Sequence, residues 1–310
     1  MDLSTGNPKR LKRGKCVMKK IPVLKKEKME RSSASSVRNA VIKYCVLVLV
    51  LLVAMLMLAP LYLVVINSFK DPADYSINGP VAFPENWTTG AFNRYLGAVN
   101  FPRLLWNSVL ISGVTALVGT VISLFSAYAL GIGRIKGRTG LIFVLLIATM
   151  LPQEALLYPL FYGAQGIGLH NSVWSVIIIF SILQAAMGTY LLASVMSTFP
   201  REVLEAAQVD GAGRFRVLIS VVYPIMRPSL AVLMVFFFVW TWNEFLIPMI
   251  MLVGPDSQTL PIALANLKGQ NTLDVTQMAA ASLLSLLPTL MFFAFFQRTL
   301  TRGVAAGSVK

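Results

Sequence analysis

Long apolar runs separated by short polar segments divide this chain. A bilayer core about 30 Å thick needs roughly 20 apolar residues in a helix to cross it. Six runs are long and apolar enough, at residues 44–66, 106–130, 141–162, 173–195, 228–253 and 275–296. The pattern therefore predicts an all-α membrane protein with six transmembrane helices.

The composition agrees with a membrane protein and excludes several other classes. The chain has 310 residues, of which 56% are hydrophobic and 13% charged, whereas soluble domains carry about 25% charged residues. An ordinary soluble enzyme, a disordered chain and a polar nucleic-acid-binding domain are therefore excluded. Cys16 and Cys45 are too few for a disulfide framework or a zinc site. No nucleophile, zinc-protease or phosphate-loop motif is present, so we expect neither an enzyme nor a metal or cofactor site.

The distribution of positive charge predicts the orientation in the membrane. Of the 27 Lys and Arg residues, 23 lie in the N-terminal segment, the second and fourth loops and the C-terminal tail, and 4 lie in the other loops. Lys and Arg accumulate in cytoplasmic segments, so both termini are predicted to be cytoplasmic. Residues 1–40 are expected to form a disordered basic tail on anionic lipid, followed by a membrane domain over 41–310.

Small residues recur at steps of three and four along the second predicted span. They are Ser112, Ala116, Gly119, Ser123 and Ala127, which share one helix face. Small side chains let helix backbones approach closely within lipid. This span is therefore expected to pack against another helix on that side.

Polar groups inside the predicted spans are candidates for a transport pathway. Burying a carboxylate in lipid is unfavourable, so Glu154 and Glu244 are expected to face a bundle interior, a partner or a water-filled cavity. Glu154 lies between Pro152 and Pro159, which predict a broken helix. Aromatic rings beside amide and carboxylate groups suit a sugar, although an interhelical hydrogen bond is the alternative for Glu244. The pathway candidates are Asn107, Gln184, Trp240, Asn243 and Glu244.

The loop over residues 197–227 is longer than a connection between helices requires. Pro200 and Glu202 suit a helix start and Gly211 suits a helix stop, which predicts a helix of about three turns. Residues 214–222 are expected to form a second short helix that stops near Pro224. The loop is either an amphipathic interfacial segment or a rigid projection for a cytoplasmic partner.

A sequence motif in this loop resembles a known family. Glu205-Ala206-Ala207, Gly211 and Val221-Val222-Tyr223-Pro224 are spaced as in the Glu-Ala-Ala loop of ABC importer permease subunits. Val221 stands where Ile is common, and Tyr223 where Leu is common. The resemblance to the maltose-type carbohydrate permeases also covers Pro152-Gln153, Pro159-Leu160, the segment 168–172, Trp242-Asn243-Glu244-Phe245, Gln297-Arg298 and the C-terminal segment 303–310.

The resemblance implies a fold, a function and partners. The fold is that of the type I ABC importer transmembrane domain, and the chain is similar to the smaller maltose-type permease in the cell membrane. Its partners would be a second permease, two ATPase subunits and an external binding protein for a sugar or oligosaccharide. Coupling to the ATPase is implied for Val203, Glu205, Ala206, Ala207, Asp210, Gly211 and Pro224. An ABC importer for a non-sugar solute and a proton-coupled secondary transporter remain the alternatives.

Overall fold

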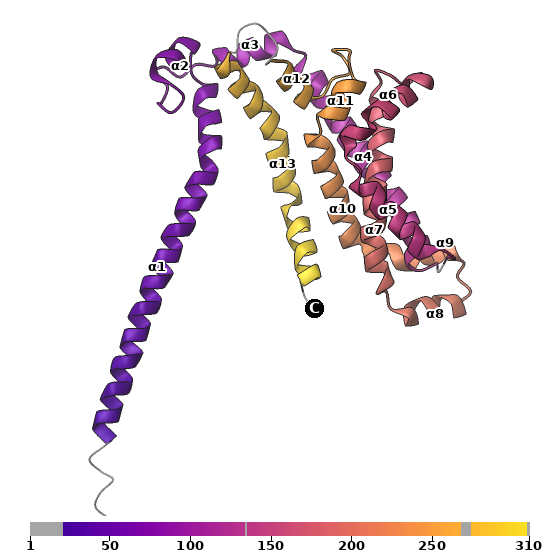
Figure 1. Cartoon of the computed structure of the whole chain (residues 1–310), viewed down its shortest axis with the longest axis horizontal. Helices are drawn as coiled ribbons and strands as arrows, with labels where there is room; N and C mark the ends of the chain where they lie inside the picture. The colour runs from indigo at the N-terminus through magenta and orange to yellow at the C-terminus, as the bar shows by residue number, and fades with distance from the viewer. Residues whose placement is uncertain (1–20, 134, 268–273, 309–310) are drawn as a thin grey trace, which may run out of the picture. The chain divides into compact units, whose positions relative to one another are not determined.

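The computed structural model describes residues 21–133, 135–267 and 274–308, and the regular elements in this part of the chain are all helices (Figure 1). The helices are α1 (Ile21–Ser68), α2 (Pro72–Asn78), α3 (Gly90–Ala98), α4 (Phe101–Gly131), α5 (Arg138–Met150), η1 (Gln153–Leu156), α6 (Leu157–Gly166), α7 (Val173–Ser197), α8 (Arg201–Val209), α9 (Arg214–Val217), η2 (Leu218–Val222), α10 (Tyr223–Asn243), α11 (Leu246–Met251), α12 (Leu260–Asn266) and α13 (Val275–Ser308).

Two compact units divide the chain between Tyr62 and Leu63. Most of α1 belongs to the first unit. Helix α1 begins at Ile21, so residues 21–40 are helical rather than disordered as the sequence predicted. Residues 24–31 of this segment are all Leu, Lys, Glu, Met or Arg, which have high intrinsic helix propensity. The rest of the predicted tail, residues 1–20, lies outside the described residues.

Five helical stretches among the described residues are long and apolar enough to cross a membrane, and a bent pair gives a sixth if it is counted as one span. The five are Val41–Ser68, Phe101–Gly131, Val173–Ser197, Arg214–Asn243 and Val275–Arg298. The bent pair is Arg138–Met150 with Gln153–Gly166, and its two arms differ in direction by 93°. Pro152 explains this bend, because a residue before proline favours extended backbone, which Leu151 adopts. The broken helix predicted around Glu154 is thus confirmed.

The fifth span differs from its predicted position. The sequence placed a separate short helix before Pro224 and a span over 228–253, but one continuous helix runs from Arg214 to Asn243. Its π turn, η2, widens the helix just before Pro224, and the Tyr223 N–H donates to the Leu218 carbonyl. A proline lacks an N–H and its ring clashes with the carbonyl one turn earlier in a regular α-helix. The wider turn therefore lets the helix pass through Pro224.

A proline also explains why α10 ends where it does. In a continued helix, Pro248 would face the Glu244 carbonyl without an N–H to donate to it. The backbone of Glu244 is extended instead, with φ −74° and ψ 134°, and α11 starts afresh at Leu246. Glu244 was predicted to lie in the middle of a span, and it lies at the break between α10 and α11.

Helices α4, α7 and α10 form the centre of the second unit (Figure 1). The five small residues predicted to share one face of α4 are all buried, and α4 packs along α7 through this face. The ring of Phe237 on α10 is fully buried against Gly119 of α4 and Gly188 of α7. Close approach of the three backbones therefore depends on residues without bulky side chains.

Polar contacts, in addition to apolar packing, fix the segment between α1 and α4. The ammonium group of Lys70 is fully buried, and it donates to the carbonyls of Gly79 (2.9 Å) and Ala82 (2.6 Å). Arg94 on α3 donates to the Asp274 carboxylate at 3.0 Å and to the Thr276 hydroxyl at 3.0 Å. These bonds join α3 to the start of α13.

Candidate functional site

Helix α8 has a well-defined beginning. Pro200 occupies the N-cap with φ −59°, and Glu202 lies in the first turn, where the helix dipole favours a negative charge. The sequence placed Pro200 one position later, at the first helical residue. The preceding residue, Phe199, is buried in the cluster formed by α4, α7 and α10, so it anchors the start of the loop.

The end of α8 is a Schellman motif. The N–H of Gly211 donates to the Gln208 carbonyl at 3.0 Å, and the N–H of Ala212 donates to the Ala207 carbonyl at 3.0 Å. Gly211 has a φ of +74°, which a residue with a Cβ adopts only at a cost. The helix stop predicted at Gly211 is therefore confirmed, and the turn has a defined geometry.

The two faces of α8 have different surroundings. Leu204, Ala207 and Ala212 are half-buried against the chain's own apolar cluster. Val203 and Val209 are exposed, and 87% of the Val209 surface is accessible. The sequence grouped Val203 with Ala207 on one face, but Leu204 is the residue that packs beside Ala207.

The predicted coupling residues fall into two groups. Val203, Glu205, Ala206, Asp210 and Gly211 are exposed and available to a partner, whereas Ala207 is directed partly inward. Pro224 lies beyond the loop, in the first turn of α10. The sequence missed Val209 and Phe215 (67% exposed) as surface groups of the same loop. Single exposed apolar residues are common on protein surfaces, so nothing local in the sequence distinguished these two.

The loop is joined to the membrane helices at two points. Val217, Leu218 and Val222 of the α9–η2 segment are buried among residues of α4, α7 and α10. The phenol of Tyr128, near the end of α4, donates to the Arg214 carbonyl at 3.0 Å. The loop is therefore attached both to α10 and to α4.

Two of the five pathway candidates are engaged inside the protein. The buried Asn107 amide donates to the carbonyls of Asp256 (2.8 Å) and Gln258 (2.9 Å). The buried Gln184 amide on α7 donates to the Thr241 hydroxyl on α10 at 2.8 Å. Both amides hold parts of the fold together: Asn107 uses both of its N–H donors in these bonds, and burial keeps Gln184 away from a substrate.

The other three candidates lie near the end of α10. Asn243 is exposed and donates to the Val239 carbonyl at 2.7 Å. Trp240 is half-buried, with its ring edge-on to Phe236 at a centroid distance of 5.7 Å. Glu244 is half-buried at the helix break, where its carboxylate accepts a long bond (3.4 Å) from the Leu246 N–H. Phe236, Trp240 and Asn243 follow one another along one side of α10, and their exposure leaves that side available to a substrate or a neighbouring subunit.

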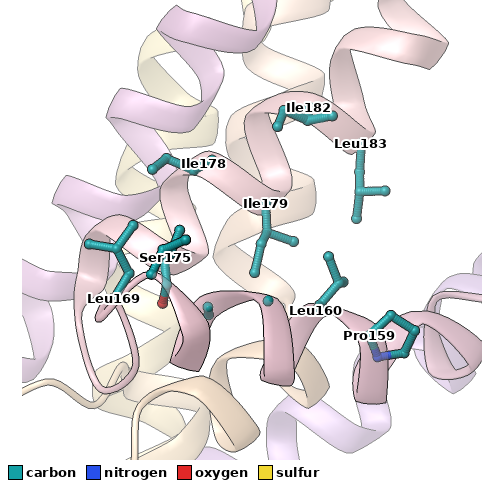
Figure 2. A pocket seen from close by; sticks show the side chains of 11 residues that line it. Pro159, Leu160, Leu169, Ser175, Ile178, Ile179, Ile182 and Leu183 are labelled. Carbon is teal, nitrogen blue, oxygen red and sulfur yellow. The ribbon is translucent and has the colours of Figure 1, made fainter.

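Two cavities in the second unit have opposite character. A cavity of about 240 Å³ lies between α6 and α7, and Figure 2 shows Ile178, Ile179, Ile182 and Leu183 of α7 above Pro159 and Leu160 of α6. Its lining is almost entirely apolar, so it offers a sugar few hydrogen-bonding groups. A second cavity, of about 480 Å³, is lined mainly by polar atoms and lies at the start of α4 and α7.

Comparison with known proteins agrees with the loop motif. Residues 119–305 match the family described as "Binding-protein-dependent transport system inner membrane component". The diacetylchitobiose uptake system permease protein of Streptomyces coelicolor is 27% identical over 289 residues, which is 91% of this chain and 93% of that protein. The melibiose/raffinose/stachyose import permease protein of Bacillus subtilis is 28% identical over 253 residues, covering 81% of this chain and 91% of that protein.

A solved structure shares the fold. It is the crystal structure of a bacterial ABC transporter involved in the import of the acidic polysaccharide alginate, with a TM-score of 0.70 at 20% identity. The similarity covers 81% of this chain and 93% of that chain. The family match spans more than half of the chain and includes α8 and its capping glycine. The chain therefore belongs to the inner-membrane components of binding-protein-dependent transport systems, the permease subunits of ABC importers.

Proposed function

We propose that this chain forms half of the translocation pathway of an ATP-driven importer for a sugar or oligosaccharide. The observation that carries the proposal is α8, a capped helix with one face packed on the membrane helices and the other face exposed. The relatives named above support the sugar class, since they serve diacetylchitobiose and the melibiose group of sugars.

The partners follow from this assignment. The chain pairs with a second, different permease, and an external binding protein delivers the sugar. Two ATPase subunits dock on the cytoplasmic side, where both termini and the α8 loop lie. The excess of Lys and Arg in these segments supports this orientation.

Coupling runs through the exposed face of α8. Val203, Glu205, Ala206 and Val209 contact the ATPase subunit, while Leu204 and Ala207 hold α8 against the membrane helices. Closure of the ATPase pair on ATP shifts α8, and the buried α9–η2 segment passes the shift to α10. The exposed side of α10, with Trp240 and Asn243, then changes its access from the inner to the outer side of the membrane.

The energy source tests the class of transporter. Cells that carry the whole importer should take up at least one sugar from a panel of diacetylchitobiose, melibiose and raffinose. Uptake should continue when a protonophore collapses the proton gradient while ATP is maintained. Uptake that stops with the gradient while ATP persists would support a proton-coupled carrier instead. Uptake of none of these sugars by an assembled complex that hydrolyses ATP would favour a non-sugar solute.

Cross-linking tests the coupling role of α8. A cysteine at Ala206 or Val209 should cross-link to a cysteine in the ATPase subunit, with a yield that changes when ATP is added. A cysteine at Ala207 is the matched control, because this neighbouring position is turned partly toward the chain's own core. Equal yields at all three positions in every nucleotide state would contradict the assigned face.

A further inference from the structure

The polar cavity lies at the end of α4 and α7 that is opposite the α8 loop. Helix α7 has 25 residues and is therefore about 37 Å long at 1.5 Å per residue, and the cavity lies at its first residues while the α8 loop follows its last. The cavity has a volume of about 480 Å³, which falls within the usual range of roughly 300–1,000 Å³ for small-molecule sites. Its lining includes two indoles, a guanidinium, a carboxylate, an amide and a hydroxyl, from Trp106, Trp174, Arg103, Asp256, Asn171 and Ser172.

One wall of the cavity is held in place by side-chain amides. Asn107 donates to the Asp256 and Gln258 carbonyls, as described above. The Asn171 side-chain oxygen accepts from the Gly254 N–H at 2.8 Å and from the Ser257 hydroxyl at 2.8 Å. A Cβ at Gly254 would lie 2.8 Å from the Asn171 amide nitrogen, so any other residue there would have to displace this side chain. The loop over residues 254–257 is therefore fixed before any ligand binds.

Several polar groups of the lining residues have hydrogen-bonding capacity that the described part of the protein leaves free. Arg103 uses its Nε for the Asp256 carbonyl at 3.2 Å, and its terminal nitrogens make no further hydrogen bond within the described residues. The Asp256 carboxylate and the two indole N–H groups likewise have no partner in the part of the chain that the structure describes. Trp106 is 60% exposed and Trp174 is 53% exposed. Residues with free donors, a residue with a free acceptor and two partly exposed indoles thus line one cavity.

We propose that this cavity is a sugar subsite, which holds one unit of the carbohydrate as it leaves the binding protein and enters the membrane. The proposal rests on the function proposed above. A pyranose ring has an apolar face that stacks on an indole and hydroxyl groups that both donate and accept hydrogen bonds. Arg103 can donate to a hydroxyl oxygen, and Asp256 can accept from a hydroxyl. Opposite charges on the same lining disfavour a strongly anionic or cationic ligand.

Saturation-transfer difference NMR tests the subsite directly. The probes are diacetylchitobiose, melibiose and raffinose, each added to the permease–ATPase complex in nanodiscs without its binding protein. The sugar that the cells import should give a saturable signal. Trp106→Ala and Trp174→Ala should each lower its apparent affinity by about fivefold or more, because each removes a stacking surface. Trp106→Phe should recover most of the affinity, and Asp256→Asn should weaken it.

A matched control separates the subsite from a general effect of losing an exposed indole. Trp87 is also 60% exposed, but it packs on Phe69 away from this cavity, so Trp87→Ala should leave the signal unchanged. If an imported sugar gives no saturable signal, the subsite is wrong while the transport function stands. If the alanine variants lose assembled complex but keep the affinity, the indoles are membrane-interface anchors and the subsite is wrong. If none of the sugars is imported, the sugar function fails and the subsite fails with it.

Discussion

Gly188 on α7 lies directly against the side chain of Ser123 on α4. A Cβ built at Gly188 would overlap the Ser123 hydroxyl and would lie 2.7 Å from the ring of Phe237 on α10. The Ser123 hydroxyl donates to the Gly119 carbonyl of its own helix at 2.7 Å. Three helices therefore meet at one point where no side-chain atom can be added without displacing a neighbour.

We predict that Gly188→Ala destabilises the membrane domain by about 1–3 kcal/mol, the usual effect of overpacking a close-packed interior. The measurement is the amount of folded permease in detergent during a thermal ramp. Gly113→Ala on α4 is the control, because a Cβ there meets nothing within 4 Å. Equal melting of the two variants would contradict this packing.

We expect a change at Gly211 to affect the coupling of ATP hydrolysis to transport rather than the folding of the membrane domain. The Gly211 φ of +74° makes most residues with a Cβ unfavourable there by roughly 1–2 kcal/mol, and Asp, although it tolerates this conformation better than most, also brings a charge to the exposed turn. Gly211→Asp should insert into the membrane normally but should lose transport, and ATP should be hydrolysed without uptake or the ATPase should dissociate. Gly213→Ala is the control, since Gly213 has an ordinary φ of −66°. Normal uptake by Gly211→Asp would argue against a coupling role for this turn.

The hydrogen bond from Tyr128 to the Arg214 carbonyl links α4 to the base of the α8 loop. We predict that Tyr128→Phe leaves assembly with the ATPase intact but lowers the amount of sugar imported per ATP hydrolysed. The phenylalanine keeps the ring and removes only the hydroxyl, whose bond contributes about 1 kcal/mol. The ratio of uptake to hydrolysis in proteoliposomes is the measurement. An unchanged ratio would show that α10 alone transmits the movement.

The contact between Arg94 and Asp274 predicts how stability depends on pH. Burial alone would raise the pKa of Asp274, but hydrogen bonds from Thr276 and the Gln277 N–H, together with Arg94, outweigh it and lower the pKa below 3.8. A carboxyl with a lowered pKa in the folded state stabilises the fold above the unfolded pKa. That contribution is lost as the pH falls through the folded value. Melting temperature should therefore fall more steeply below about pH 4 in the wild type than in Asp274→Asn.

A companion variant makes the test specific to this pair. Arg94→Gln should lower the melting temperature at neutral pH, because Asp274 loses its cationic partner, and should lower it less in strong acid. If Asp274→Asn and the wild type follow the same profile between pH 7 and pH 3, this carboxyl does not tie α3 to α13.

The Glu244 carboxylate at the end of α10 is a candidate residue of the transport pathway. Within the described residues it accepts one hydrogen bond, from the Leu246 N–H, and this bond is long at 3.4 Å, so the carboxylate contributes little to the helix break. We predict that Glu244→Gln and Glu244→Ala assemble normally with the ATPase but lower uptake severalfold. The measurement compares uptake with the amount of assembled complex. Loss of assembly would indicate a structural role instead.

Local features of the sequence determined most of the secondary structure and the motif of the loop. Four of the predicted spans lie within observed helices, because about 20 apolar residues in succession satisfy their backbone only as a helix in lipid. The break at Pro152 and the stop at Gly211 were also predictable, since proline and glycine act on their own stretch of backbone. The same holds for the buried face of small residues on α4, which depends only on helical spacing.

The tertiary structure decided how the polar groups are used. Asn107 and Gln184 looked like pathway residues, yet their partners lie on the loop after α11 and on α10, 149 and 57 positions further along the chain. Ala206 and Ala207 are identical neighbours, and only the packing of α8 on the chain's own core distinguishes the exposed residue from the half-buried one. The polar cavity is assembled from α4, the start of α7 and the loop after α11. Hydrogen bonds and packing between distant segments depend on the positions of the helices in space. The spacing of residue types within one segment does not reveal those positions.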